Sequence, residues 1–321
     1  HFGAKLIESY KPVCSPDSVF LFPNHPDTEL FRFTSAYYRD KILAVDTIVG
    51  SVLQELEDAD LLESTFVFYF GDHGGVLPGS KGYAYESGLH VPLVVRIPKR
   101  FRHLVDQKRG RASDNFVSFV DFGPTLLKLA GIEVPEGVDG IPFLGKEARG
   151  QITYGYADRF DEKYDLVRSV RKGDLKYMRS YQPFNVDGLQ NNYRYLCLAY
   201  QQWRDMYHAG ELNPVQAAFF EAREPEALYD LSSDPYETLN LAGDPAYADR
   251  LSEMREHLDK WVKGMPDLSF YPENILRSKA FGNPLLFGRE HQEDIGKLVD
   301  IANLELLPFE EARGEIARAL D

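Results

Sequence analysis

The chain has 321 residues, of which 44% are hydrophobic and 13% aromatic, and its formal net charge is −14. A chain of this size and composition can bury one large core or two unequal cores. The excess of acidic side chains argues against a nucleic-acid partner, because binding to phosphates needs clustered lysine and arginine. No apolar run approaches about 18–20 residues, so the sequence predicts no membrane span.

Residues 1–30 are irregular and contain four prolines, which exclude a long helix there. Over residues 30–62, apolar side chains recur at spacings of three and four, which predicts an amphipathic helix. The segment STFVFYF (64–70) is a continuous run of β-branched and aromatic residues. It predicts a strand buried on both faces, of the kind found in parallel sheets, and VPLVVRIP (91–98) predicts a second one.

A second helix is predicted over 117–132, with Pro124 near its first turn and Gly131 past its end. The order helix, strand, loop, strand, helix predicts α/β layering for residues 1–150. Residues 151–265 are shorter, alternating and turn-rich segments closed by a helix, which predicts an antiparallel α+β subdomain. Residues 266–321 predict a helical tail, compatible with the start of a HEAT-like array.

Only two cysteines are present, Cys14 and Cys197, and their distance in sequence predicts free thiols rather than a bridge. The chain begins at His1 without an initiator methionine or a signal peptide and ends within a helical pattern. We therefore expect it to be part of a longer polypeptide.

The loop between the two predicted strands holds the residues best suited to chemistry. Asp72 and His73 follow the first strand directly, in a turn flanked by glycines. The end of such a strand faces the crevice where α/β proteins bind ligands. A carboxylate beside an imidazole suits a divalent cation, and Lys81, nine residues after Asp72, can neutralise an anion held there. An ordinary turn is the alternative interpretation of a single Asp-His-Gly.

The string STFVFYFGDHGGVLPGSKGYAYESGLHVPLVV resembles the sulfatase family, in which a strand ends in Asp-His-Gly or Asp-Asn-Gly and a lysine precedes a Tyr-Glu segment. Three further stretches agree in order and spacing: SAYYRDKILAVDTIVGSVLQEL, FVSFVDFGPTLLKLAGIEVPEGVDGIPFL and LYDLSSDPYETLNLAGDP. The resemblance covers roughly residues 30–260. It implies an α/β fold with an alkaline-phosphatase-like mixed sheet flanked by helices and a smaller C-terminal α+β subdomain.

The resemblance also implies roles for individual residues. Asp72 and His73 occupy positions that hold Ca²⁺, or Mg²⁺ in some members, and Lys81 occupies the position that binds the sulfate and supports the nucleophile. The metal and Lys81 would stabilise charge on the sulfuryl oxygens. His1 stands in the order of a histidine that assists leaving-group departure, and His90 in the position of a substrate-facing arginine or histidine. An incidental terminal histidine and packing at a strand start are the respective alternatives.

The family's nucleophile is a formylglycine made from Cys or Ser in a C/S-x-P-S-R motif. Cys14 precedes Pro16, but Asp17 and Ser18 stand where that motif has Ser and Arg. The paired N-terminal aspartates that complete the family's metal site are missing as well. We therefore expect the nucleophile outside this chain, in an N-terminal half of the enzyme or in a second chain.

The function that follows from the resemblance is metal-assisted hydrolysis of sulfate esters or sulfamates, with a sulfated saccharide as the expected substrate. One alternative is a phosphoryl or phosphonate hydrolase or transferase of the same superfamily, which the VDGIPFL and LYDLSSDP segments disfavour. Another is a non-catalytic glycan-binding pseudoenzyme or subunit, which the missing nucleophile favours. An extracytoplasmic location, whether periplasmic, secreted or lysosomal, is expected by resemblance.

Overall fold

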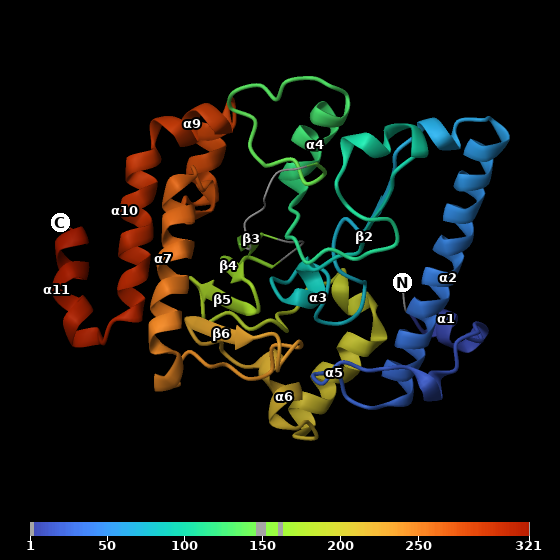
Figure 1. The fold of residues 1–321 in the computed structure, drawn as a ribbon. Helices are drawn as coiled ribbons and strands as arrows, with labels where there is room; N and C mark the ends of the chain where they lie inside the picture. The colour runs from blue at the N-terminus through green and yellow to red at the C-terminus, as the bar shows by residue number, and fades with distance from the viewer. Residues whose placement is uncertain (1–2, 146–151, 160–162, 321) are drawn as a thin grey trace.

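The computed structural model describes residues 3–145, 152–159 and 163–320 (Figure 1). Strands β1 (Val67–Phe70) and β2 (Leu93–Arg96) form a two-stranded antiparallel sheet. A second, four-stranded antiparallel sheet runs in chain order through β3 (Ile152–Ala157), β4 (Val167–Lys172), β5 (Leu175–Ser180) and β6 (Glu226–Asp230). The helices are α1 (Ala4–Ser9), α2 (Glu29–Asp58), α3 (Glu86–Leu89), α4 (Phe122–Leu129), α5 (Leu198–Ala209), α6 (Pro214–Ala217), α7 (Ala248–Gly264), α8 (Glu273–Ile275), α9 (Pro284–Glu290), α10 (Gln292–Asn303) and α11 (Phe309–Leu320).

The four-stranded sheet is covered on one face by α7. Val170, Tyr177 and Leu228 stand opposite one another on β4, β5 and β6, and all three are buried. They pack with apolar side chains from one stripe of α7, including Met254 and Leu258. Helix α10 lies beside α7 and adds to the same core (Figure 1). The antiparallel α+β arrangement expected after residue 150 is therefore present.

A second core is almost entirely aromatic. Trp203 of α5 is fully buried and stacks on Phe219, with ring centroids 4.2 Å apart. Phe31 of α2 meets Trp203 edge-on, and Tyr83 and Tyr200 complete the cluster. This core ties the start of α2 to the loop that follows β1, so the loop rests on a rigid base.

Strands β1 and β2 occur where the sequence predicts them, but the prediction that they are buried on both faces, as in a parallel sheet, was wrong. They pair antiparallel, and one face packs Phe68, Leu93 and Val95 against Phe122 and Phe143. On the other face Val94 is 61% exposed. The reason is that the apolar cluster with Phe122 and Phe143 packs on the face of Phe68, Leu93 and Val95, whereas Val94 points to the opposite face.

Helix α2 confirms the amphipathic helix predicted over residues 30–62, yet only its first third is packed. Its buried residues end at Asp40. Farther along, the helix runs at the edge of the molecule (Figure 1). Ile48 is 62% exposed, and the other exposed apolar residues on the same side of the helix are Ile42, Val45 and Val52. We call these four residues the α2 apolar face.

The helix predicted over 117–132 is present as α4, and Gly131 follows it with a φ of +71°, as a helix-terminating glycine should. Cys14 and Cys197 are free thiols, as predicted. Among the described residues, no helix has both the length and the hydropathy to cross a membrane.

Replacement of a core residue in the four-stranded sheet should be costly. We expect Leu228→Ala to lower the free energy of unfolding by about 3 kcal/mol, because a fully buried leucine loses its contacts and leaves a cavity. Urea denaturation measures this change. The matched control is Leu239→Ala, at a leucine that is largely exposed, which should stay within about 0.5 kcal/mol of the parent. Equal losses in the two variants would contradict the core described above.

Candidate functional site

The turn after β1 brings a carboxylate and an imidazole together. The Gly71 N–H donates to the Pro92 carbonyl (3.2 Å), which closes the β1–β2 sheet just before this turn. The carboxylate of Asp72 then lies 3.5 Å from His73 Nε2, and its side chain is 82% exposed. His73 Nδ1 lies 2.9 Å from the Gly74 carbonyl. A carbonyl only accepts, so Nδ1 is the donor in this contact, and Nε2 is the nitrogen that faces Asp72.

This turn is packed directly on helix α3. The Gly74 N–H donates to the Gly88 carbonyl over 2.9 Å. A Cβ atom on Gly74 would lie 2.0 Å from the Ser87 carbonyl oxygen, so only glycine fits here. The position of Asp72 and His73 is therefore set by the position of α3.

The loop that carries Lys81 is anchored by the aromatic core. His25 Nε2 lies 2.7 Å from the Pro78 carbonyl, and the Gly79 N–H donates to the Tyr200 hydroxyl over 2.9 Å. Gly79 has a φ of +76°, which disfavours any side chain there. The Lys81 N–H donates to the Gly75 carbonyl (3.2 Å), so the backbone of Lys81 returns to the turn that starts with Asp72.

Helix α3 is held by a buried cluster of charges. Glu86 Oε1 lies 3.1 Å from Lys176 Nζ, and Glu86 Oε2 pairs with Arg171 and, over 3.4 Å, with Nδ1 of His90. Burial acts to raise the pKa of Glu86, but the hydrogen bond from His90 and the charges of Lys176 and Arg171 outweigh it and lower that pKa to about 2. Glu86 is therefore ionised at every physiological pH.

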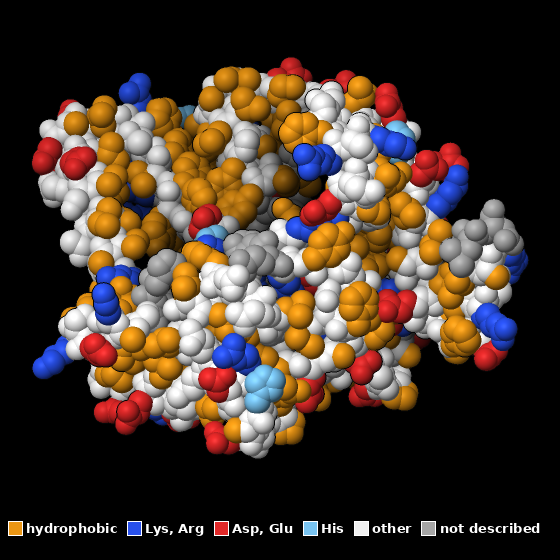
Figure 2. Space-filling model, turned by 180° about the vertical axis from the view of Figure 1, so that it is seen from behind, with side chains coloured by type: hydrophobic (Ala, Val, Ile, Leu, Met, Phe, Trp, Pro, Cys, Tyr) orange, Lys and Arg blue, Asp and Glu red, His pale blue; other side chains and the backbone are white. Residues whose placement is uncertain are grey.

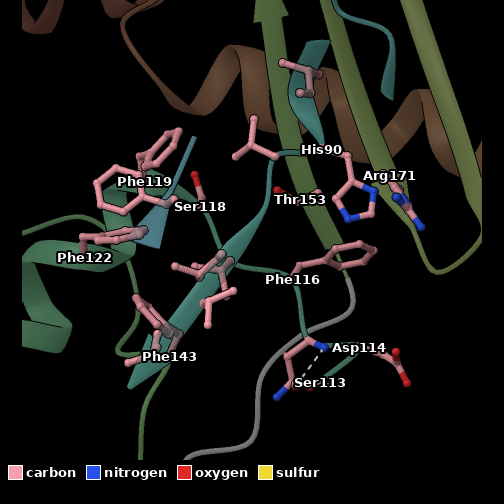
Figure 3. A pocket seen from close by; sticks show the side chains of 18 of the residues that line it. His90, Ser113, Asp114, Phe116, Ser118, Phe119, Phe122, Phe143, Thr153 and Arg171 are labelled. Carbon is pink, nitrogen blue, oxygen red and sulfur yellow. Dashed lines mark hydrogen bonds between the residues drawn. The ribbon is translucent and has the colours of Figure 1, made fainter. Parts of the chain in front are cut away.

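A large cavity of about 1980 Å³ opens between the β1–β2 sheet and the four-stranded sheet. Figure 2 shows it as a hollow walled largely by hydrophobic side chains. In the closer view, Phe119, Phe122 and Phe143 line one side, while His90 and Arg171 lie together on the other, next to Phe116 (Figure 3). Asp72, His73 and His90 all line the cavity. The site thus combines an apolar wall, which suits a ligand ring, with polar groups suited to an anion.

The structure brings three of the five predicted site residues to one cavity. Asp72 and His73 are adjacent, and His90, whose side chain is 72% exposed, lies at the far end of α3. Lys81 is not one of the lining residues, although its neighbour Gly82 is. His1 lies outside the described residues, so its assignment stays a prediction.

Cys14 has the chemistry of a resting thiol rather than a nucleophile. Its backbone N–H donates to Asp40 over 2.8 Å. A hydrogen bond from the thiol to the Asp40 carboxylate raises the pKa of Cys14, which keeps the sulfur protonated. This agrees with the expectation that the nucleophile lies elsewhere.

Sequence reasoning missed the residues that hold α3 in place. Glu86 and Glu237 lie in two segments that resemble the family, but the resemblance assigns no role to them or to Lys176 and Arg171. The available signal was the spacing of three between charged residues in VRSVRK (167–172) and LKYMRS (175–180), which places a charge on each face of both strands. Charged side chains on both faces of a strand that also carries core residues indicate charges with buried partners.

Asp72 and His73 are suitable ligand types for a divalent cation, but two ligands are too few to hold one. A carboxylate and an imidazole whose other nitrogen donates to a backbone carbonyl form a typical pair of metal ligands. Ca²⁺ takes six to eight oxygen ligands, however. Within the described parts of the chain, no group of three or more His, Cys, Asp or Glu side chains could hold an ion. These residues supply part of a cation site, and the remaining ligands would have to come from other residues.

Known proteins match this chain over most of its length. Residues 14–132 match the family model described as Sulfatase. An ulvan-active sulfatase of Formosa agariphila is 37% identical over 88% of this chain and 47% of that relative. The human N-sulphoglucosamine sulphohydrolase is 28% identical over 74% of this chain and 49% of that relative. The chain therefore spans about half the length of these curated relatives.

Solved structures agree on the fold. One, determined in complex with its substrate D-glucosamine-2-N,6-O-disulfate, superposes with a TM-score of 0.53. The superposition covers 74% of this chain and 43% of the solved chain, and the two are 23% identical in sequence. The chain therefore has an alkaline-phosphatase-like fold, with open sheets flanked by helices and a smaller α+β part.

The support beneath the Lys81 loop should be sensitive to acid. Burial lowers the pKa of His25 to about 4, against about 6.5 in the unfolded chain. As the pH falls below 6.5, the unfolded state takes up a proton that the folded state does not, so stability is lost. His25 should therefore contribute a loss of about 2 kcal/mol between pH 7 and pH 5.

Urea denaturation at pH 7 and pH 5 measures this loss. His25→Gln, which cannot titrate, should show a correspondingly smaller change in the free energy of unfolding between the two pH values. The exposed His208→Gln should keep the parental pH dependence. The same pH dependence in His25→Gln and in the parent would contradict the role given to His25.

Proposed function

We propose that this chain, which belongs to the sulfatase family of the alkaline phosphatase superfamily, is part of a hydrolase that cleaves sulfate esters or sulfamates on sulfated carbohydrate. The observation that carries the proposal is the Asp72–His73 pair at the wall of the large cavity. Two relatives, an ulvan-active sulfatase and an N-sulphoglucosamine sulphohydrolase, support a carbohydrate substrate.

The residues of this chain would act mainly by binding and orientation. The Asp72 carboxylate and His73 Nε2 would be two adjacent ligands for a cation, Ca²⁺ or Mg²⁺. When bound, this cation would supply positive charge to the oxygens of the sulfuryl group. The ammonium of Lys81 would add a second positive charge for the same anion and for the nucleophile. His90 would contact the substrate from the other end of α3.

The apolar wall of the cavity gives the sugar a place to lie. Phe119, Phe122 and Phe143 are neighbours there, with ring centroids 5.1 to 5.5 Å apart (Figure 3). Their faces suit the C–H surface of a saccharide ring. Arg171 and His90 on the opposite wall suit its anionic substituents.

The rest of the enzyme would supply what these residues lack. We propose that an N-terminal half of the enzyme, carrying the formylglycine nucleophile and the remaining metal ligands, packs on the α2 apolar face and on the open side of the β1–β2 sheet. Two facts support this: the chain spans about half of its curated relatives, and the apolar side chains of α2 and β2 lie exposed. By the same resemblance we propose an extracytoplasmic location.

Removal of the proposed anion and cation ligands should abolish most turnover. In the complete enzyme, we expect Lys81→Ala and Asp72→Ala each to lower kcat for sulfate release by about 10²–10³-fold, since each removes a charge that stabilises the transition state. Lys260→Ala and Glu256→Ala, at exposed positions on α7, are the matched controls and should keep parental turnover. Unchanged kcat in both site variants would remove Asp72 and Lys81 from the mechanism.

The same assay distinguishes the alternatives. A sulfatase should release sulfate from a sulfated monosaccharide with a kcat/KM well above that for a matched phosphonate monoester. A reversed preference would favour the phosphoryl or phosphonate alternative, and no turnover of either substrate by the complete enzyme would favour a glycan-binding pseudoenzyme.

The α2 apolar face offers a separate test of the missing half. In the complete enzyme we expect Ile48→Glu to lower the free energy of unfolding by about 3 kcal/mol, because a carboxylate would be buried in an apolar interface. Leu285→Glu, at an equally exposed leucine of α9, should cost less than about 0.5 kcal/mol. Thermal or urea denaturation measures both, and equal small effects would show that nothing packs on this face.

A further inference from the structure

Two of the sequence segments that carry the family resemblance meet in the folded chain through one buried lysine. Glu86 belongs to the Tyr-Glu segment after Lys81, and Glu237 belongs to DPYETLN (234–240). Lys176 Nζ lies 3.1 Å from Glu86 Oε1 and 2.7 Å from Glu237 Oε1. The side chains of Lys176 and Glu237 are almost fully buried. The contact therefore joins residues 151 positions apart in an environment that excludes water.

Glu237 also holds α3 directly. Its Oε2 accepts the backbone N–H of Glu86, the first residue of α3, over 2.6 Å. Glu237 itself has a φ of +57°, a conformation that is unfavourable for a residue with a side chain. The turn is maintained by Asp234, whose carboxylate accepts the N–H groups of Thr238 and Leu239. A strained residue whose carboxylate reaches the start of another element indicates a role at that element.

The order of contacts continues from α3 to the candidate site. Gly88, within α3, accepts the N–H of Gly74, and Gly74 fits only because it has no side chain. Gly74 follows His73 directly, and its carbonyl receives His73 Nδ1. Each step from Glu237 to His73 is thus a specific short contact between groups that are fixed by packing.

The charges in this cluster balance. Lys176 and Arg171 stand opposite each other on β5 and β4 and provide two positive charges for the two carboxylates. Removal of one member would leave a buried charge without its partner, which strongly favours local rearrangement over the observed packing. The intact cluster therefore favours the observed position of α3.

We propose that Glu237 and Lys176 are positioning residues for the candidate active site, through which the C-terminal four-stranded sheet fixes α3 and, through Gly88 and Gly74, the Asp72–His73 turn. The inference rests on the proposed function for the identity of the groups that are positioned. The C-terminal subdomain would thus support catalysis by positioning the Asp72–His73 turn, although it lies far from Asp72 in the sequence.

Hydrogen exchange tests the positioning without any need for activity. In this chain, we expect Glu237→Ala to accelerate amide exchange of Gly74 at least tenfold, while amides of β4 and β5 stay within twofold of the parent. Glu237→Gln keeps an acceptor for the Glu86 N–H but loses the charge, so it should give a smaller acceleration, about threefold. If Glu237→Ala does not fold, Glu237→Gln and Lys176→Met carry the test.

Glu253→Gln is the matched control, because it removes an exposed carboxylate that pairs with Lys172 on the same sheet. It should leave exchange at Gly74 unchanged. Unchanged exchange at Gly74 in the Glu237 variants, or equal acceleration across β4, β5 and Gly74, would overturn the inference, since the second result describes a purely structural role.

Kinetics of the complete enzyme provide the second readout. A positioning role predicts that Glu237→Ala lowers kcat at least tenfold with KM within twofold of the parent, and that Glu237→Gln restores part of the loss. A rise in KM alone would overturn the inference. If the complete enzyme releases no sulfate at all, the proposed function fails, and the exchange experiment still decides whether Glu237 holds the turn.

Discussion

Lys176 lies between two carboxylates in a region closed to water, and the arrangement of the molecule depends on that fact. The two ion pairs are important for stability, because a buried charge that loses its partner strongly destabilises the fold. One partner comes from the short helix α3 and the other from the turn after β6, so the lysine fixes the separation of two parts of the fold. Glu86 and Lys176 both line the large cavity, so part of this cluster belongs to the cavity wall.

Local sequence properties were enough to locate many of the elements. The period of apolar residues predicted α2 and α7, because amphipathicity depends only on the residues of one helix. The proline and glycine that bound α4 were equally informative. Asp72 and His73 could be singled out because they are neighbours in sequence and therefore in space. In each case the deciding interactions lie within a few residues.

The features that sequence reasoning missed depend on contacts between distant residues. Nothing in STFVFYF states what packs on each face of the strand, so the exposure of β1 and β2 could not be predicted from their hydrophobicity. Apart from His90, the partners of Glu86 lie 85 to 151 residues away and are selected by strand register and packing. The resemblance to a family supplied expected roles for individual residues, but it gave no account of what holds those residues in place.

The imidazole of His25, beneath the Lys81 loop, affects the pH range in which the folded chain is stable. His25 is packed against Phe31 and Trp203, and protonation there would introduce a cation among aromatic rings with no carboxylate to receive it in the contacts that surround it. Acidity therefore weakens the support of the Lys81 loop at a pH where Glu86 is still ionised. As far as this imidazole is concerned, the folded chain is more stable in a near-neutral medium than in an acidic one.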